Sequence, residues 1–403
     1  MTPDDSDARP NSVKMEIPPD RADGSSSWVH AGLIYSGVLG QIEPLVLLPA
    51  WLASVAISAW PWSPPLRLPA AAMAALFLVF DGAMLALLPR AHRSWGPVTP
   101  PLLGLTCVRI LLSWLMALIF PDTCHTIGLS LTLVLHIVLG ATAAYATWIE
   151  PFRLGVTRER YTHPRGPDRP LRLLHISDLH IEGWSPREDT LLAQAEALQP
   201  DLIVVTGDYL NLSSIHDPAA HRDVRALLSR LDAPLGVYAI SGSPVVDQSA
   251  IIGKLLSDLP LRWLQDEGVA IQYGGQTLWL MGVRNTYIED RDAAAIRRLM
   301  SQAPPDALTV LLYHTPDLMP VARELGVDLY LCGHTHGGQL RLPLYGAIAT
   351  SSKWGKRYEM GRYREGETTL YVSRGLGVEG LGAPRARFLS PPEIILWEIG
   401  STI

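Results

Sequence analysis

Segment 332–339 reads Cys332-Gly-His-Thr-His-Gly-Gly-Gln339 and closes a short apolar run that predicts a β-strand. Two earlier segments have the same form, because Ile176-Ser-Asp-Leu-His180 and Thr206-Gly-Asp208 also end apolar runs. Glycines in and beside these segments let the backbone turn sharply and leave room next to the polar side chains. Each segment therefore places aspartate or histidine at the end of a buried strand.

The chain around these segments alternates between strand-like and helix-like patterns. The predicted strands span residues 171–177, 201–208, 235–240, 276–282, 307–313 and 328–332. The predicted helices span residues 189–199, 218–231, 249–258, 291–302 and 317–325. Strands that alternate with helices predict an α/β domain, which we expect over residues 171–400.

Six polar residues fall just past the ends of these strands, at the edge where α/β sheets place their ligands. They are Asp178, His180, Asp208, His314, His334 and His336. Carboxylate and imidazole together suit Mn²⁺, Fe or Zn²⁺ better than Ca²⁺, which prefers oxygen ligands. The alternative is a set of unrelated solvated or core residues, which six strand ends with these spacings disfavour.

These motifs, together with Tyr313-His-Thr-Pro-Asp317, resemble those of calcineurin-like metallophosphoesterases over about residues 170–400. The closing stretches 370–377 and 388–394 look like the bacterial membrane-associated phosphodiesterase branch of that family. The resemblance implies a four-layer αββα sandwich that binds two divalent metal ions. It implies that the first metal is held by Asp178, His180 and His336, the second by His314 and His334, and that Asp208 bridges them. The implied reaction is phosphoester hydrolysis by a metal-bound hydroxide.

One motif departs from the family pattern. After strand 235–240 the family has Gly-Asn-His-Asp, whereas this chain has Gly242-Ser243-Pro244-Val245. Ser243 offers a hydroxyl as a poorer metal ligand, and the Pro244 side chain cannot transfer a proton. Loss of a general acid typically lowers the rate by about 10²–10⁴-fold. His216 is a candidate replacement, although a lone loop histidine is more often simply solvated.

Two functions follow from this departure. In the first, the protein remains a phosphodiesterase or pyrophosphatase that acts on a substrate with a good leaving group. In the second, it is a degenerate relative that binds metal or a phosphate ligand as a membrane-attached sensor or scaffold. Retention of the six other ligands favours the enzyme.

The first third of the chain has a different composition from the rest. The 403 residues carry a net charge of −6, yet between Ala31 and Ile149 only seven are charged: Glu43, Arg67, Asp81, Arg90, Arg93, Arg109 and Asp122. Four apolar segments, about 33–59, 69–89, 101–120 and 127–149, are long enough to cross a membrane. Tryptophans near their ends suit the headgroup region. The acidic balance argues against nucleic-acid binding, and three cysteines against a disulfide scaffold.

Residues 1–30 form a polar acidic tail without the pattern of a cleaved signal peptide. Residues 150–170 are rich in proline and arginine and predict an extended linker. Four crossings put both chain ends on one side, and most basic loop residues, such as Arg90, Arg93 and Arg153, lie on that side. The positive-inside rule then places the catalytic domain in the cytoplasm of a multi-pass membrane protein.

Several ionisable residues lie inside the apolar segments, namely Glu43, Asp81, Arg109 and His136. An Asp81–Arg109 pair that fixes helix packing is the favoured interpretation, and a lipid or ion site is the alternative. Because Glu43 precedes Pro44, it marks a kink or the start of a shorter first helix.

Membrane attachment suggests a phosphoester carried by a lipid or released near the bilayer, such as a lipid-linked nucleotide pyrophosphate. The alternative interpretation is a general phosphodiesterase that the helices only anchor to the membrane. Lys353 is a candidate substrate-binding residue, and Arg374 and Arg387 are weaker candidates of the same kind. A solvated basic loop explains Lys353 equally well.

Overall fold

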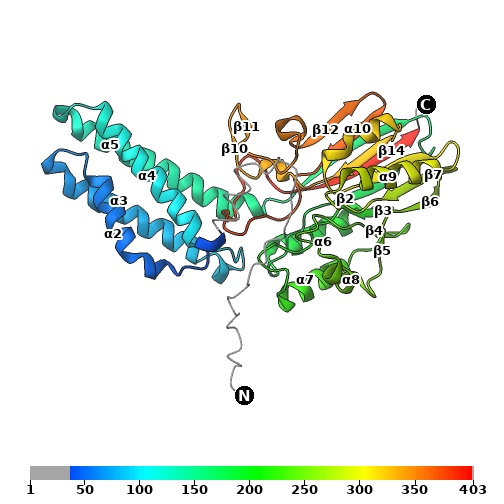
Figure 1. The fold of residues 1–403 in the computed structure, drawn as a ribbon, viewed down its shortest axis with the longest axis horizontal. Coiled ribbons are helices and arrows are strands. Elements are labelled where there is room, and N and C mark those ends of the chain that lie inside the picture. Colours follow the sequence, from blue (N-terminus) through cyan, green and yellow to red (C-terminus); the bar gives the residue numbers. More distant parts are fainter. Residues whose placement is uncertain (1–36, 402–403) are drawn as a thin grey trace, which may run out of the picture.

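The computed structural model describes residues 37–401 and consists of a helical bundle and an α/β domain joined end to end (Figure 1). The acidic tail predicted over residues 1–30 lies outside the described residues.

The bundle contains four helices: α2 (Leu48–Ala59), α3 (Pro64–Ala86), α4 (Thr99–Ile119) and α5 (His125–Ala144). A π turn (Tyr145–Ile149) and a 3₁₀ turn (Glu150–Phe152) extend α5. By length and composition, α3, α4 and the stretch Asp122–Phe152 are able to cross a membrane, whereas the apolar stretch Pro44–Ala59 is shorter. The structure therefore supports three of the four predicted spans by length.

The predicted first segment, 33–59, is shorter than expected because of Glu43-Pro44. Proline has no backbone N–H and disfavours helical geometry in the residue before it. Glu43 accordingly has an extended ψ of 133° and stands at the N-cap of the 3₁₀ turn Pro44–Leu47 that precedes α2. The sequence prediction of a helix start at this position agrees with the structure.

The helices run up and down. At the end far from the α/β domain, Trp62 Nε1 donates to Ser113 Oγ (2.9 Å) and the Ser63 N–H donates to His125 Nδ1 (3.0 Å). At the near end, Trp148 Nε1 donates to the Met84 carbonyl (3.1 Å). The α3–α4 connection and the end of α5 therefore lie together beside the α/β domain (Figure 1).

The predicted pair of buried charges joins α3 to α4. Arg109 donates from Nε to Asp81 Oδ2 (2.7 Å) and from Nη2 to Asp81 Oδ1 (2.8 Å). Its Nη1 donates to the His136 carbonyl on α5 (2.9 Å), and its guanidinium lies over the Phe77 ring. Since this arginine binds groups on two neighbouring helices, the geometry matches the packing interpretation.

The α/β domain contains two six-stranded sheets. The first has the order β1 (Gly155–His163), β14 (Glu393–Ser401), β2 (Leu171–Ile176), β3 (Leu202–Val205), β4 (Val237–Ala239) and β5 (Arg262–Trp263). The second has the order β12 (Gly361–Glu365), β13 (Thr368–Val372), β9 (Leu329–Cys332), β8 (Leu308–Leu312), β7 (Gln276–Gly282) and β6 (Glu267–Tyr273). A separate hairpin pairs β10 (Arg341–Leu342) with β11 (Gly346–Ala347).

Helices cover the outer face of each sheet. The five helices are α6 (Pro186–Leu198), α7 (Pro218–Leu228), α8 (Ser249–Leu256), α9 (Glu289–Ser301) and α10 (Met319–Glu324). One apolar cluster joins α6, α7 and α8 to the first sheet, a second lies between the sheets, and a third joins α9 and α10 to the second sheet. The layers therefore run helices, sheet, sheet, helices, as the αββα expectation requires.

The predicted linker 150–170 differs from the structure. Residues Gly155–His163 form β1, which pairs in parallel with β14 at the edge of the first sheet. This strand is hard to recognise in the sequence because an edge strand buries few side chains: β1 has only Val156 and Tyr161 as large apolar residues, and only Tyr161 is buried. The connection between bundle and domain is thus a structural strand rather than a spacer.

Parallel pairing positions the site. Strands β2, β3 and β4 are parallel to one another, and so are β7, β8, β9 and β13. Since the carboxyl ends of parallel strands meet at one edge, the loops after them converge there.

Candidate metal centre

The six predicted ligands lie in the loops that leave the carboxyl ends of four strands. Asp178 and His180 follow β2, Asp208 follows β3, His314 follows β8, and His334 and His336 follow β9. All but His334 are buried. Two groups of three emerge, Asp178 with His180 and His336, and Asp208 with His314 and His334, and within each the candidate ligand atoms lie within 4.8 Å of one another.

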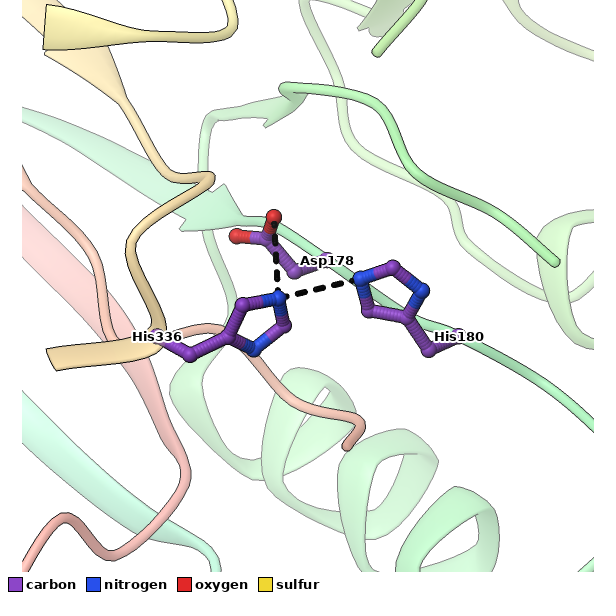
Figure 2. A group of neighbouring side chains, drawn as sticks. All are labelled: Asp178, His180 and His336. Carbon is purple, nitrogen blue, oxygen red and sulfur yellow. Dashed lines mark hydrogen bonds and ion pairs between the residues drawn. The ribbon is translucent and has the colours of Figure 1, made fainter. Parts of the chain in front are cut away.

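The first group points its polar atoms into one small space (Figure 2). His180 Nε2 lies 3.1 Å from His336 Nε2, which in turn lies 3.8 Å from Asp178 Oδ1. The second carboxylate oxygen, Asp178 Oδ2, is buried without a hydrogen-bond partner in the described residues. A buried oxygen without a donor is costly unless a cation satisfies it, so this group fits a divalent metal.

The His180 ring is held in the orientation that a ligand needs. Its Nδ1 lies 2.7 Å from Glu379 Oε2, which favours a proton on Nδ1 and directs Nε2 at the other two ligands. Burial disfavours the charged ring, but Glu379, Asp208 and Asp178 outweigh it and raise the pKa of His180 to about 9. A metal held by Nε2 would require this nitrogen to be unprotonated, so metal binding would compete with protons at neutral pH.

The second group surrounds the Asp208 carboxylate. His314 donates from Nδ1 to the Thr206 carbonyl (2.8 Å), and its Nε2 lies 3.1 Å from Asp208 Oδ2. Burial disfavours the Asp208 anion, but the neighbouring histidines His314, His180 and His334 lower the pKa of its carboxyl below its usual range. Asp208 Oδ2 also lies 3.6 Å from His180 Nε2, so the same oxygen faces both groups.

Ser243 occupies the side of the second group where the family asparagine is missing. Its Oγ lies 3.2 Å from His314 Nε2 and 3.3 Å from His334 Nδ1. Its backbone N–H donates to Asp208 Oδ1 (2.6 Å). The structure therefore brings Ser243 to the position from which the sequence predicts a weak ligand.

The backbone at the site adopts a conformation that is rare outside glycine. The φ angles are 50° at Asp178, 42° at His180, 55° at Asp208, 69° at His334 and 52° at His336. Each such residue costs about 1–3 kcal/mol, and strain of this kind gathers at functional sites. Five of the six predicted ligands share it.

Two glycines allow the loops to meet. A Cβ atom on Gly333 would lie 2.0 Å from Asp178 Oδ2, and one on Gly242 would lie 2.1 Å from Asp208 Oδ1. Both approaches are impossible for any other residue without moving a ligand.

Comparison with known proteins supports the same chemistry. The family model for calcineurin-like phosphoesterases matches residues 171–338. The metallophosphoesterase YkuE of Bacillus subtilis, whose function is uncharacterised, is 31% identical over 281 residues, which cover 65% of this chain and 91% of YkuE. The chain belongs to the calcineurin-like phosphoesterase family.

Two further relatives have named activities. The phosphodiesterase YaeI of Escherichia coli is 28% identical over 63% of this chain and 92% of its own length. The UDP-2,3-diacylglucosamine pyrophosphatase LpxG of Chlamydia trachomatis is 24% identical over 67% of this chain and 97% of its own length. The similarity thus covers nearly all of each relative.

Asp247 is a residue of the phosphoesterase site that the sequence analysis missed. Its buried carboxylate accepts N–H groups from Asp208 (2.8 Å), Tyr209 (3.2 Å) and Gly242 (2.7 Å). Burial and the nearby Asp208 charge raise the pKa of Asp247 to about 7. It ties the loop after β3 to the loop after β4. The only sequence signal was an acidic residue after the run Pro244-Val-Val246.

The remaining candidates from the sequence lie in other surroundings. His216 is exposed on the turn before α7 and, within residues 37–401, makes no hydrogen bond or ion pair with the six ligands. Lys353 pairs with Glu289 (2.5 Å), and Arg374 pairs with Glu393 (2.6 Å). None of these contacts supports a substrate role.

Arg387 is fully buried in the phosphoesterase and supports the first group instead of reaching a substrate. Its Nη2 lies 3.3 Å from His336 Nδ1 and donates to the Arg374 carbonyl (2.7 Å). Its backbone N–H donates to the Ala146 carbonyl at the end of the helical bundle (2.8 Å). Arg387 therefore connects a candidate metal ligand to the helices.

Proposed function

We propose that the protein is a membrane-anchored, metal-dependent hydrolase of phosphoesters with good leaving groups, in which four helices cross the membrane and the catalytic domain faces the cytoplasm. The single observation that carries the proposal is the position of Asp208, which belongs to the second group and also faces His180 of the first. Its Oδ2 faces histidines of both, as a ligand shared by two cations would. Two divalent ions bound there would supply an activated water and neutralise phosphoryl oxygens.

The residues of this chain hold that arrangement in place. Glu379 fixes the His180 ring, and the Thr206 carbonyl fixes His314. Asp247 holds the backbone of Asp208, and Ser243 completes the second group with a hydroxyl. Because the ligands are held by neighbours rather than free to rotate, little reorganisation is needed when a phosphoester binds.

The absence of an acid at Pro244 selects the substrate. A leaving alkoxide needs a proton, whereas a leaving phosphate or nucleoside phosphate departs as a stabilised anion. We infer that a pyrophosphate bond suits this site better than a simple alkyl diester. The name of LpxG describes a pyrophosphatase whose substrate is a diacylated sugar nucleotide, which is the class of lipid-linked substrate proposed here.

The replacement at Ser243-Pro244 also favours a second candidate, a degenerate phosphoesterase that binds metal or phosphate as a membrane-attached sensor or scaffold. Both candidates require metal binding. They differ only in turnover, so the experiment must measure the two separately.

The test uses the full chain purified in detergent, with bound metal counted and hydrolysis of bis-p-nitrophenyl phosphate followed with added Mn²⁺. Metal-dependent hydrolysis that disappears in Asp208→Asn supports the hydrolase. Asp290→Asn is the matched control, because Asp290 is exposed in the first turn of α9. Stoichiometric metal without hydrolysis of this ester or of a nucleoside diphosphate ester favours the sensor, and absence of metal binding overturns both.

A further inference from the structure

Large apolar side chains are exposed in one region of the α/β domain. Among the described residues after Phe152, six such side chains are exposed, and five of them lie in two short segments: Leu342, Leu344, Tyr345 and Ile348 in and beside the β10–β11 hairpin, and Leu389 in the loop before β14. The sixth is Ile288, at the start of α9. The four hairpin residues each expose half or more of their surface. Concentration of this kind marks an interaction site.

Two of these leucines have a backbone that glycine or asparagine would adopt more easily. Leu344, at the hairpin tip, has a φ of 65°, and Leu389 has a φ of 56°. The left-handed region is unfavourable for bulky residues. An exposed side chain makes few packing contacts that could offset this conformational cost. Folding alone therefore disfavours leucine at both positions, and a function at the surface accounts for them.

The hairpin lies between the metal centre and the bundle. It begins directly after the ligand segment His336–Gly338, and Leu340 pairs with Phe388 in an isolated parallel bridge. The Phe388 ring lies edge to face with that of Tyr145, which follows α5, with ring centroids 6.3 Å apart. Figure 1 shows β10 and β11 projecting from the α/β domain on the side of the bundle.

The charge beside the turn of the hairpin suits a membrane surface. The Lys356 ammonium lies 3.4 Å from the centroid of the Tyr345 ring, donates to the Tyr345 carbonyl and is partly exposed. A tyrosine beside a lysine, next to exposed leucines, is the pattern of segments that enter the headgroup region with their apolar side chains toward the acyl chains.

We propose that the β10–β11 hairpin and Leu389 insert into the surface of the lipid bilayer that holds the bundle, and so bring the metal centre to lipid-borne phosphoesters. The proposed partner is the bilayer because the exposed Leu389 directly follows Phe388, whose ring contacts Tyr145 at the end of the apolar helix α5. The insertion stands independently of catalysis. Its use for substrate entry rests on the proposed function.

Insertion is tested with an environment-sensitive fluorophore on Leu344→Cys, in a chain whose accessible cysteines are replaced (Cys107→Ser and Cys124→Ser). The third cysteine, Cys332, is buried. On transfer of the full chain from detergent to phosphatidylcholine–phosphatidylglycerol vesicles, the emission shifts to shorter wavelength and is quenched by brominated lipid. The same label on Ile288→Cys stays in water and is not quenched. A label at 344 that brominated lipid does not quench overturns the proposal, whether water or a second protein copy surrounds it.

Substrate entry is tested with Leu344→Asn, which folds readily because asparagine tolerates a positive φ. Hydrolysis of soluble bis-p-nitrophenyl phosphate is unchanged, whereas hydrolysis of CDP-diacylglycerol in vesicles falls about tenfold through loss of one inserted leucine. Equal effects on both substrates overturn the entry role. If wild-type protein hydrolyses neither, the proposed function fails while the fluorescence result still decides insertion.

Discussion

Ser243 Oγ lies 3.2 Å from Asp208 Oδ2, within the group that would hold the second metal. A hydroxyl therefore stands where the family has an amide, and the half-buried Pro244 follows where the family has a histidine. Since Asp208, His314 and His334 keep their places, the structure separates metal binding from proton transfer. The residues present can hold a second metal, but no side chain at position 244 can transfer a proton.

The variant Ser243→Asn/Pro244→His restores the family residues at these two positions. We expect hydrolysis of a phosphodiester with an alkyl leaving group to rise by about tenfold or more, because a well-placed general acid contributes about 10²–10⁴-fold when the leaving alkoxide needs a proton. Steady-state kinetics of the full chain with Mn²⁺ measure the change. Ser243→Asn alone should raise only the affinity for the second metal. No gain in the double variant, with metal still bound, would show that the missing pair does not limit turnover.

Glu379→Gln removes the carboxylate beside His180 Nδ1 while preserving shape. Loss of such a partner typically lowers metal affinity or activity by about 10- to 100-fold. We expect the dissociation constant of the tighter metal to rise by that factor, measured by titration calorimetry of the metal-free full chain. Glu398, which is partly exposed and pairs with Arg160 on the first sheet, provides a control in Glu398→Gln. Unchanged affinity would mean that His180 needs no such support.

Because Asp81 and Arg109 are a buried ion pair, we expect a single replacement to lower the stability of the bundle more than replacement of both residues. Arg109→Leu leaves Asp81 buried without its partner and should destabilise the bundle by about 3–5 kcal/mol. Asp81→Leu/Arg109→Leu removes both charges and should recover much of that loss. Thermal denaturation in detergent measures the order, with exposed Arg90→Gln as control. A double variant less stable than either single one would contradict the packing role and favour an ion or lipid site.

His175 predicts a pH dependence of stability. Burial lowers the pKa of His175 to about 3, whereas the unfolded residue has its ordinary value of 6.5. Below pH 6.5 His175 is protonated in the unfolded chain but stays neutral in the folded chain. The free energy of unfolding therefore falls as the pH falls from 6.5 to about 3. The loss is about 1.4 kcal/mol per pH unit over that window.

Denaturation of metal-free wild type and His175→Asn between pH 7 and pH 4 isolates this contribution. The wild type should lose more stability than the variant across the window, whatever the variant's stability at pH 7. Parallel curves would show that His175 is protonated in the folded chain.

Spacing within short segments was enough to predict most of the α/β domain. The predicted strand 276–282 has the bounds of β7, and the predicted strand 307–313 differs from β8 by one residue at each end. Period-two and period-3.6 patterns of apolar residues show which face of a strand or helix is buried. They can therefore be recognised in the sequence without knowing which element packs against that face. The ligands were predictable for the same reason, since each directly follows such a strand.

Elements stabilised by distant partners were not predictable in this way. Strand β1 was interpreted as a linker because its pairing partner, β14, lies more than two hundred residues away in the chain. Neighbouring residues do not reveal the roles of Glu379 and Asp247 either, since these roles depend on His180 and on the Asp208 and Gly242 backbone. Such contacts exist only after the loops converge.

The sequence by itself determined the alternation of strands and helices, the apolar helices of the first third and the polar residues at the strand ends. Only the tertiary structure decided that Asp208 faces both groups, that Ser243 lies among the ligands, and that Phe388, which pairs with Leu340 before the hairpin, contacts Tyr145 at the end of α5. The physical reason is the distance along the chain over which each feature is determined. Hydrophobic periodicity depends on neighbouring residues, whereas the geometry of a site depends on how segments far apart in the sequence pack together.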